Sequence, residues 1–155
     1  MIDSSMNGAC ILTINHKEEA YMKKSVDSVS TRTTESFEAF KQALETGHTA
    51  DFLDKVTDGF HFFVPLPLDG WDHKQQGKER FEELVRLERS VFQMQLIPLV
   101  LIENADHGTV VFRSEGLLNG RSFSNELAIV FEFEGERIAS FREYVGMPLK
   151  NYEAP

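Results

Sequence analysis

The sequence has a single cysteine and no long apolar run, and each shortage removes a class of protein. Cys10 has no partner for an internal disulfide, and no pair of Cys or His residues has the spacing of zinc ligands. No apolar run approaches the roughly 20 residues that span a bilayer. We therefore expect no disulfide, no bound metal, no cofactor and no transmembrane helix.

Basic residues are also scarce, with 16 Lys and Arg against 25 Asp and Glu and a formal net charge of −9. Nucleic acids and anionic membranes bind through a basic stripe, which these scattered cations do not form. The N-terminal apolar stretch from Gly8 to Ile14 has no basic lead and is too short for a secretory signal. The sequence predicts an acidic cytoplasmic protein that binds neither nucleic acid nor membrane.

The apolar content is sufficient for one core. Apolar residues make up 41% of the chain and include 13 Phe, which suits a single domain. Residues 1–30 have no sustained hydrophobic period, so we expect an N-terminal tail or extension with a short helix from Lys17 to Lys24. Met22 is an alternative start of the natural chain. We place the domain at residues 31–147 and a polar C-terminal tail at 148–155.

Three segments have the hydrophobic period of amphipathic helices. The first runs from Thr33 to Gly47, and the second is a short helix that starts at Thr49 and is broken by Gly59. The third spans Lys78 to Phe92 and places charged residues on its outer face. These helices are expected to cover one face of a sheet.

The remaining segments are typical of β-structure. Phe60 to Val64 is aromatic and is followed by proline, which cannot donate to a central ladder. Longer strands are expected at 94–104 and 109–118, followed by a hairpin from Arg121 to Val145. The order predicts an α+β domain in which three N-terminal helices pack on the concave face of a strongly curved, mainly antiparallel sheet.

The C-terminal hairpin carries an acid at an apolar position. A three-residue loop, Glu134 to Glu136, is expected to pair Phe133 with Arg137. Side-chain alternation then directs four residues of the last strand to the core: Ala139, Phe141, Glu143 and Val145. A carboxylate there is costly unless it is paired or hydrated. Glu143 therefore lines a cavity or anchors a buried network, unless the strand face is misassigned, and Asn125 has the same status.

Several motifs match a known group of proteins: Asn119-Gly120-Arg121-Ser122-Phe123-Ser124-Asn125, Ile129-Val130-Phe131-Glu132-Phe133, Gly135, Ile138 and Arg142-Glu143-Tyr144. With the order of elements, they resemble the SnoaL-like group of the nuclear transport factor 2-like superfamily, especially ketosteroid-isomerase-related proteins. The resemblance covers about Thr33 to Val145. It implies a cone-shaped domain that encloses an apolar pocket and forms a homodimer through the outer face of its sheet. It does not fix a function, because the superfamily includes both enzymes and non-catalytic modules.

One enzyme pattern of that superfamily does not fit the sequence. In the ketosteroid isomerase pattern, the tyrosine, the base and the protonated aspartate fall on or near Phe40, Phe63 and Ile129. Apolar side chains cannot perform that chemistry, so steroid isomerase activity is not expected.

The limonene-epoxide-hydrolase pattern fits better. Arg113-Ser114-Glu115 matches the Arg-x-Asp pair of this pattern, and Glu143 matches its last acid. In that chemistry one carboxylic acid protonates the leaving oxygen while the other carboxylate activates water. The pattern's orienting Asn falls on Phe63 and its Tyr on His61. His61 is either a base or a structural residue. Arg113 and Glu115 alternatively form a surface ion pair that points to solvent.

A loop from Leu68 to Gly77 is expected to close the mouth of the cone. Trp71 and His73 of this loop are candidates to cap a ligand, although Trp71 could equally cover the end of the core. The other residues expected to contact a ligand are Asn125, Phe40, Phe63 and Phe141.

The sequence thus predicts a protein that binds a small, mainly apolar molecule in an internal pocket. Catalysis, where present, would be cofactor-free acid–base chemistry of the hydrolase or isomerase type, with four candidate residues: Glu143, His61, Arg113 and Glu115. The alternative is a non-catalytic ligand-binding or dimerisation module whose pocket is filled by its own Phe residues.

Overall fold

The computed structural model describes residues 31–148, so the expected N-terminal tail with its helix and the residues after Pro148 lie outside the described part. The elements of the described chain follow in this order: α2 (Thr31–Thr46), α3 (Ala50–Leu53), β1 (Val56–Phe63), β2 (Gln75–Gln76), α4 (Lys78–Val91), β3 (Phe92–Glu103), β4 (His107–Leu118), β5 (Arg121–Glu134) and β6 (Arg137–Pro148).

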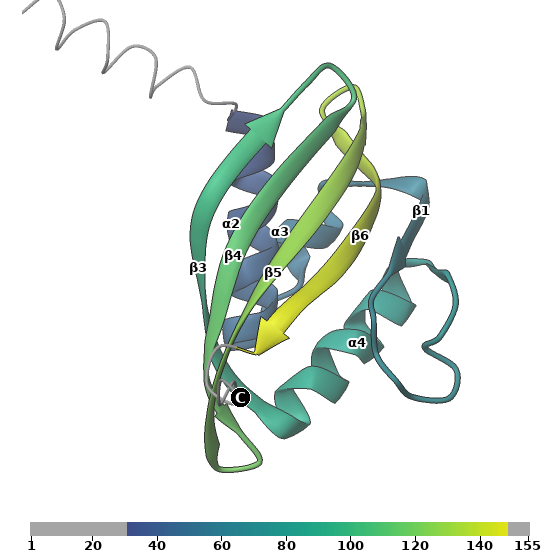
Figure 1. The fold of residues 1–155 in the computed structure, drawn as a ribbon. Helices are drawn as coiled ribbons and strands as arrows, with labels where there is room; N and C mark the ends of the chain where they lie inside the picture. The colour runs from purple at the N-terminus through teal and green to yellow at the C-terminus, as the bar shows by residue number, and fades with distance from the viewer. Residues whose placement is uncertain (1–30, 149–155) are drawn as a thin grey trace, which may run out of the picture.

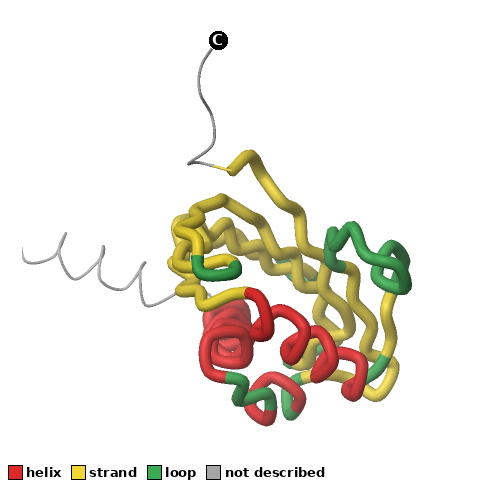
Figure 2. Tube along the Cα trace, turned by 90° about the horizontal axis from the view of Figure 1, so that it is seen from below, coloured by secondary structure: helices red, strands yellow, loops and turns green. Residues whose placement is uncertain are grey.

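The six strands form one sheet in the order β2-β1-β6-β5-β4-β3 (Figure 1). All neighbouring strands are antiparallel except β1 and β6, which are parallel. The helices lie on one side of the sheet, as the turned view in Figure 2 shows. This arrangement confirms the predicted α+β class and mainly antiparallel sheet.

The expected set of three N-terminal helices is only partly correct. Two helices, α2 and α3, precede β1, and α4 follows β2. The middle helix is a single turn that ends at Leu53, because the chain from Val56 onward pairs with β6. Gly59, expected to break a helix, lies inside β1.

A cluster of phenylalanines fills the interior between the helices and the β1–β6 part of the sheet. Phe52 of α3 stacks on Phe81 of α4 with ring centroids 4.4 Å apart, and Phe62 stacks on Phe141 at 5.1 Å. Phe40 of α2 meets Phe141 edge to face at 5.5 Å. All five rings are buried, so this part of the interior is occupied by the protein's own side chains.

Side-chain alternation on β4 separates an inner face from an outer face. Val110, Phe112 and Ser114 are buried on the face that the helices cover. Arg113 and Glu115 fall between them in sequence and are half-buried on the opposite face. The inner face of β4 therefore carries no charged residue between Val110 and Ser114.

The β5–β6 hairpin has a different register from the one expected. Glu134 pairs with Arg137 across a two-residue loop, and Gly135 in that loop has a positive φ of 62°. A β-bulge follows, because Glu132 pairs with Ser140 while Phe133 pairs with Ile138. The expected pairing of Phe133 with Arg137 is wrong.

The bulge also decides which β6 residues are buried. Ile138, and not Ala139 as expected, is fully buried near the turn. Ala139 is the extra residue of the bulge, and beyond it Phe141 and Glu143 face the core as predicted. Val145 is 51% exposed, because the strand leaves the covered part of the sheet there.

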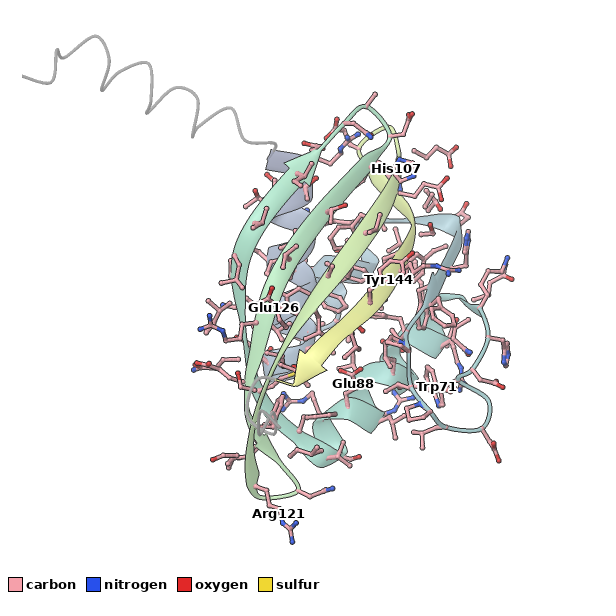
Figure 3. All side chains as sticks on the ribbon, viewed as in Figure 1. Trp71, Glu88, His107, Arg121, Glu126 and Tyr144 are labelled. Atoms are coloured by element: carbon pink, nitrogen blue, oxygen red, sulfur yellow. The ribbon has the colours of Figure 1, made fainter. Side chains whose placement is uncertain are left out.

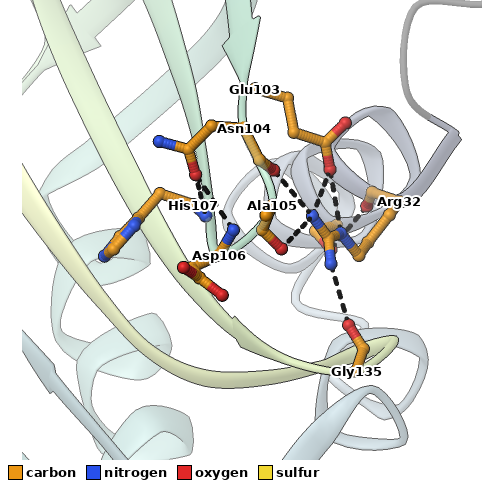
Figure 4. Close-up of polar contacts among 8 residues, drawn as sticks. Arg32, Glu103, Asn104, Ala105, Asp106, His107 and Gly135 are labelled. Carbon is orange, nitrogen blue, oxygen red and sulfur yellow. Dashed lines mark hydrogen bonds and ion pairs between the residues drawn. The ribbon is translucent and has the colours of Figure 1, made fainter.

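Arg32, near the start of α2, ties this helix to two β-turns (Figure 4). Its Nε donates to Glu103 Oε1 at 2.8 Å, and one terminal nitrogen donates to the Gly135 carbonyl at 2.9 Å. The other terminal nitrogen donates to the carbonyls of Asn104 and Ala105. One planar guanidinium thus holds the β3–β4 turn, the β5–β6 turn and the helix together.

We expect Arg32→Ala to lower the free energy of unfolding by about 1–3 kcal/mol, because several charge-assisted hydrogen bonds are lost together. Arg32→Lys keeps the charge but cannot reproduce the planar fork, so it should recover less than half of the loss. Urea unfolding monitored by circular dichroism measures both. A Lys variant as stable as the wild type would show that only the charge matters.

Candidate functional site

A cavity of about 100 Å³ lies at the end of the sheet where β6 finishes, and its wall comes from α2, α4, the segment after β1 and strands β3 to β6. Most of the lining is apolar and includes Leu44, Leu66, Leu96 and Leu127. The exposed residues Pro65 and Val145 mark the place where it opens to solvent.

Four polar side chains lie among these apolar residues: Glu88, Ser114, Asn125 and Glu143. A small concave site with apolar walls and a few convergent polar groups is the usual form of a small-molecule site. It is therefore the candidate functional site of the described chain.

Glu143 is the most deeply buried acid of the site. It follows the bulge on β6, pairs with Ile129 of β5 and is only 7% exposed. Within residues 31–148 its carboxyl group has neither a hydrogen bond nor an ion pair, and its one close charged neighbour is Glu88. Burial raises the pKa of Glu143 well above its ordinary value, and repulsion from Glu88 raises it further.

Glu88 of α4 lines the same cavity and is labelled in Figure 3. The side chain is half-buried, and burial raises its pKa from 4.5 to about 7. The two carboxyl groups have no positively charged side chain beside them on the cavity wall. Because two like charges are costly there, the pair holds at least one proton at neutral pH.

Asn125 and Ser114 form the polar part of the sheet wall and are direct cross-strand partners. The Ser114 hydroxyl donates to Met94 Sδ at 3.6 Å. The Asn125 Oδ1 atom is buried and has no hydrogen-bond partner in the described chain. A buried acceptor without a donor is unusual and leaves a position that a ligand donor could fill.

Glu88 was not predicted as a site residue, although its spacing from the apolar residues of α4 indicates that it lies on their face of the helix. Phe81, Leu84 and Val85 are the buried residues of α4. Glu88 follows them at i+7, i+4 and i+3, so it lies on the same helical face. The prediction that the charged residues of this helix lie on its outer face is wrong for Glu88.

The Arg113–Glu115 pair of the epoxide-hydrolase pattern is not at the cavity. Both residues point to the outer face of β4, where Arg113 lies opposite Glu126 of β5 and Glu115 lies opposite Ser124. The residue between them, Ser114, is the one that faces the cavity. The prediction of an Arg–acid pair beside Glu143 is therefore wrong, because strand alternation places them on opposite faces.

His61 also lies outside the site. The buried residues of β1 are its neighbours Phe60 and Phe62, so His61 points to the other face of the sheet. Its Nδ1 atom lies 3.4 Å from the Gly59 carbonyl oxygen. The expectation that His61 lines the pocket is wrong.

The loop after β1 does not place Trp71 or His73 at the cavity. Trp71 is buried against the core, and the Arg80 guanidinium stacks 3.6 Å from its ring centroid. His73 is exposed and contacts Asp72 at 3.1 Å. Trp71 therefore covers the end of the core, which was the alternative interpretation, and neither residue contacts the cavity.

The three phenylalanines expected to contact a ligand lie elsewhere. Phe40 and Phe141 belong to the packed aromatic cluster, and Phe63 lies on the outer face of β1 beneath Arg142. The aromatic residues that do line the cavity are Phe92, Phe112 and Phe123.

Within residues 31–148, no group of three or more His, Cys, Asp or Glu side chains is arranged to hold a metal ion. None of the helices in this range combines the length and apolar character that crossing a membrane requires.

Comparison with known proteins gave matches among solved structures. No protein-family model matches the chain. No curated protein matches it either. An NTF2-like protein from Anabaena variabilis is 28% identical with a TM-score of 0.65, over 87% of this chain and 96% of that one.

Two more distant structures have the same fold. An LEH-like epoxide hydrolase from M. tuberculosis is 15% identical with a TM-score of 0.59, over 76% of this chain and 84% of that one. A protein from Catenulispora acidiphila with a ketosteroid isomerase-like fold, in complex with trimethylamine, is 15% identical with a TM-score of 0.60, over 71% and 84%.

The six-stranded, mainly antiparallel sheet with helices on one side is the α+β fold that this chain shares with these structures. The chain belongs to the nuclear transport factor 2-like superfamily, as its sequence motifs indicated.

The two raised pKa values predict a specific dependence of stability on pH. An unfolded glutamate titrates near pH 4.3. The folded protein therefore binds more protons than the unfolded chain, and the stability of the neutral pair is lost as pH rises through about 7 for Glu88 and higher for Glu143.

We expect Glu143→Gln to be more stable than the wild type by about 1–3 kcal/mol at pH 8, with the difference shrinking toward zero at pH 4. Urea unfolding across this pH range measures the difference. Glu115→Gln, the same change on the outer face, is the matched control and should show no such trend. A Glu143→Gln difference that stays constant with pH would contradict the raised pKa.

Proposed function

We propose that the protein binds a small, mainly apolar molecule in this cavity and exchanges a proton with it through Glu88 and Glu143. The observation that carries the proposal is the pair of buried carboxyl groups on an otherwise apolar wall. Perturbed acids that meet in a cavity are typical of general acid–base sites. The resulting activity is a cofactor-free reaction of the hydrolase or isomerase type.

The pair has the protonation states that such chemistry needs. The Glu88 pKa of about 7 leaves this residue partly ionised at neutral pH, while Glu143 is more deeply buried and retains its proton. In a hydrolysis, Glu143 donates its proton to the leaving oxygen while the Glu88 carboxylate takes a proton from the attacking water. In an isomerisation, Glu88 removes a proton from one carbon, protonated Glu143 donates a hydrogen bond to the developing oxyanion, and Glu88 then returns the proton to a different carbon.

The volume of the cavity limits the substrate. About 100 Å³ is less than the ~150 Å³ of an engineered cavity that holds benzene, so only a few non-hydrogen atoms are enclosed. The remainder of a larger substrate would extend past Pro65 and Val145 into solvent. A steroid does not fit, which agrees with the apolar residues at the positions of the isomerase machinery.

The structural neighbours support a ligand-binding or catalytic role without fixing it. One neighbour is an LEH-like epoxide hydrolase and another was solved with trimethylamine, so proteins with this fold include both an epoxide hydrolase and a small-molecule complex. Below 25% identity such likeness concerns the fold, and Arg113 and Glu115 face away from the cavity here. The acid–base proposal therefore depends on Glu88 and Glu143.

A non-catalytic binding module is the second candidate. The aromatic cluster around Phe40, Phe62 and Phe141 fills much of the interior and leaves only the small cavity beside it. In this case the carboxyl pair binds and releases the molecule without chemical change.

We also propose that the protein is a cytoplasmic homodimer that associates through the outer face of the sheet. This face has a shallow groove lined by Val111, Ala128 and Tyr144, and Tyr144 is more than half exposed. Exposed apolar side chains grouped on one sheet face are typical of an interface.

Small epoxides and small enolisable ketones test the catalytic proposal. We expect Glu143→Gln and Glu88→Gln each to lower kcat by about 10²–10⁴-fold, since each removes one proton-transfer group. Glu115→Gln, on the outer face, should leave kcat unchanged. Equal rates in the wild type and Glu143→Gln would remove Glu143 from any mechanism, and ligand binding without turnover would favour the non-catalytic module.

A further inference from the structure

Two side chains on the cavity wall have oxygen atoms without a hydrogen-bond partner in the described chain. Glu143 is 7% exposed and has no hydrogen bond or ion pair within the described chain, and Asn125 Oδ1 is buried without a partner. Glu88 adds a second carboxyl group. A ligand that satisfies these atoms must carry N–H or O–H groups.

The cavity also lacks a positive charge of its own. Among the described residues that line it, none is Lys, Arg or His. Arg89 follows Glu88 directly, but its guanidinium donates to the backbone carbonyls of Leu44 and Glu45 and is committed there. A cationic ligand would supply the counter-charge that two buried carboxylates require.

The apolar part of the wall suits a cation as well. Phe92, Phe112 and Phe123 line the cavity, and the rings of Phe92 and Phe123 meet edge to face at 5.2 Å. Aromatic faces attract organic ammonium ions, whose alkyl groups also bury apolar surface. The combination of phenylalanine rings and carboxylates therefore selects a cation with apolar substituents.

We propose that the cavity binds a small organic ammonium ion, with its N–H groups directed to Glu143, Glu88 and Asn125 and its alkyl groups against the phenylalanines. The volume of about 100 Å³ admits an ion of about five non-hydrogen atoms. This inference rests on the proposed function only in taking the cavity as the ligand site.

Binding of such an ion is coupled to release of protons. The empty pair holds protons because burial and mutual repulsion disfavour its charged forms, whereas a bound cation favours them. Glu88 and Glu143 are the titratable groups among the described residues of the cavity wall, and Glu45, Arg89 and Glu115 line an adjoining groove instead. Affinity should therefore rise with pH, by up to about tenfold per unit for each proton released.

Isothermal titration calorimetry with tert-butylammonium and tert-butyl alcohol tests the proposal, because the two probes share a shape and differ in charge. The full chain is titrated at pH 6, 7 and 8 in two buffers of different ionisation enthalpy, which reports proton release. We expect the ammonium to bind about tenfold or more tightly than the alcohol at pH 8, with an affinity that rises with pH. The alcohol should show no such rise.

Two variants test whether the ammonium ion binds in the cavity or elsewhere on the surface. Glu143→Gln should weaken ammonium binding by about tenfold or more and reduce the proton release, whereas Glu115→Gln on the outer face should behave as the wild type. Circular dichroism confirms that each variant is folded. Equal affinity for the two probes, absence of saturable ammonium binding, or a Glu143→Gln variant with unchanged affinity and pH dependence would each overturn the proposal.

The two proposals fail in different ways. Glu143-dependent turnover of a neutral epoxide or ketone without ammonium binding would retain the acid–base function and overturn the ammonium ligand. Ammonium binding with the expected pH dependence and no turnover would support this ligand and the non-catalytic module.

Discussion

The β-bulge between β5 and β6 is the constraint on which the candidate site depends. It inserts Ala139 into the last strand, so that Ile138 is buried before the bulge and Phe141 and Glu143 are buried after it. A strand that shifts by one residue turns its side chains to the other face. Without this extra residue, one part of β6 would expose its apolar side chains or Glu143 would face solvent.

One part of the interior is filled by packed aromatic rings, and another part forms the cavity. The buried rings of Phe52, Phe81 and Phe141 lie with centroids 4.4 to 6.1 Å apart, and none of them lines the cavity. Toward the end of β6 the wall carries the shorter polar side chains of Ser114 and Asn125, and the cavity begins there. The packed aromatic part holds the elements in place, so both carboxyl groups are held at the cavity at a cost in burial energy.

The energetic cost of burying the two carboxyl groups determines their protonation. Two carboxyl groups with no cation beside them in the cavity wall retain a proton at pH values at which ordinary glutamates are ionised. Such a pair can donate a proton, accept one or bind a cation, and the fold alone does not select among these. The choice depends on the molecule that enters a space of about 100 Å³.

The sequence by itself determined the class of fold, most element bounds and the burial of Glu143, because hydrophobic periodicity and turn residues are local signals. It did not determine which charged residues share a space. Arg113 and Glu115 matched a family pattern but face outward through strand alternation, while Glu88 entered the site on a helical face read as solvent-exposed. Only the tertiary structure brought Glu88 of α4 and Glu143 of β6 to one cavity, since residues 88 and 143 are far apart in the chain.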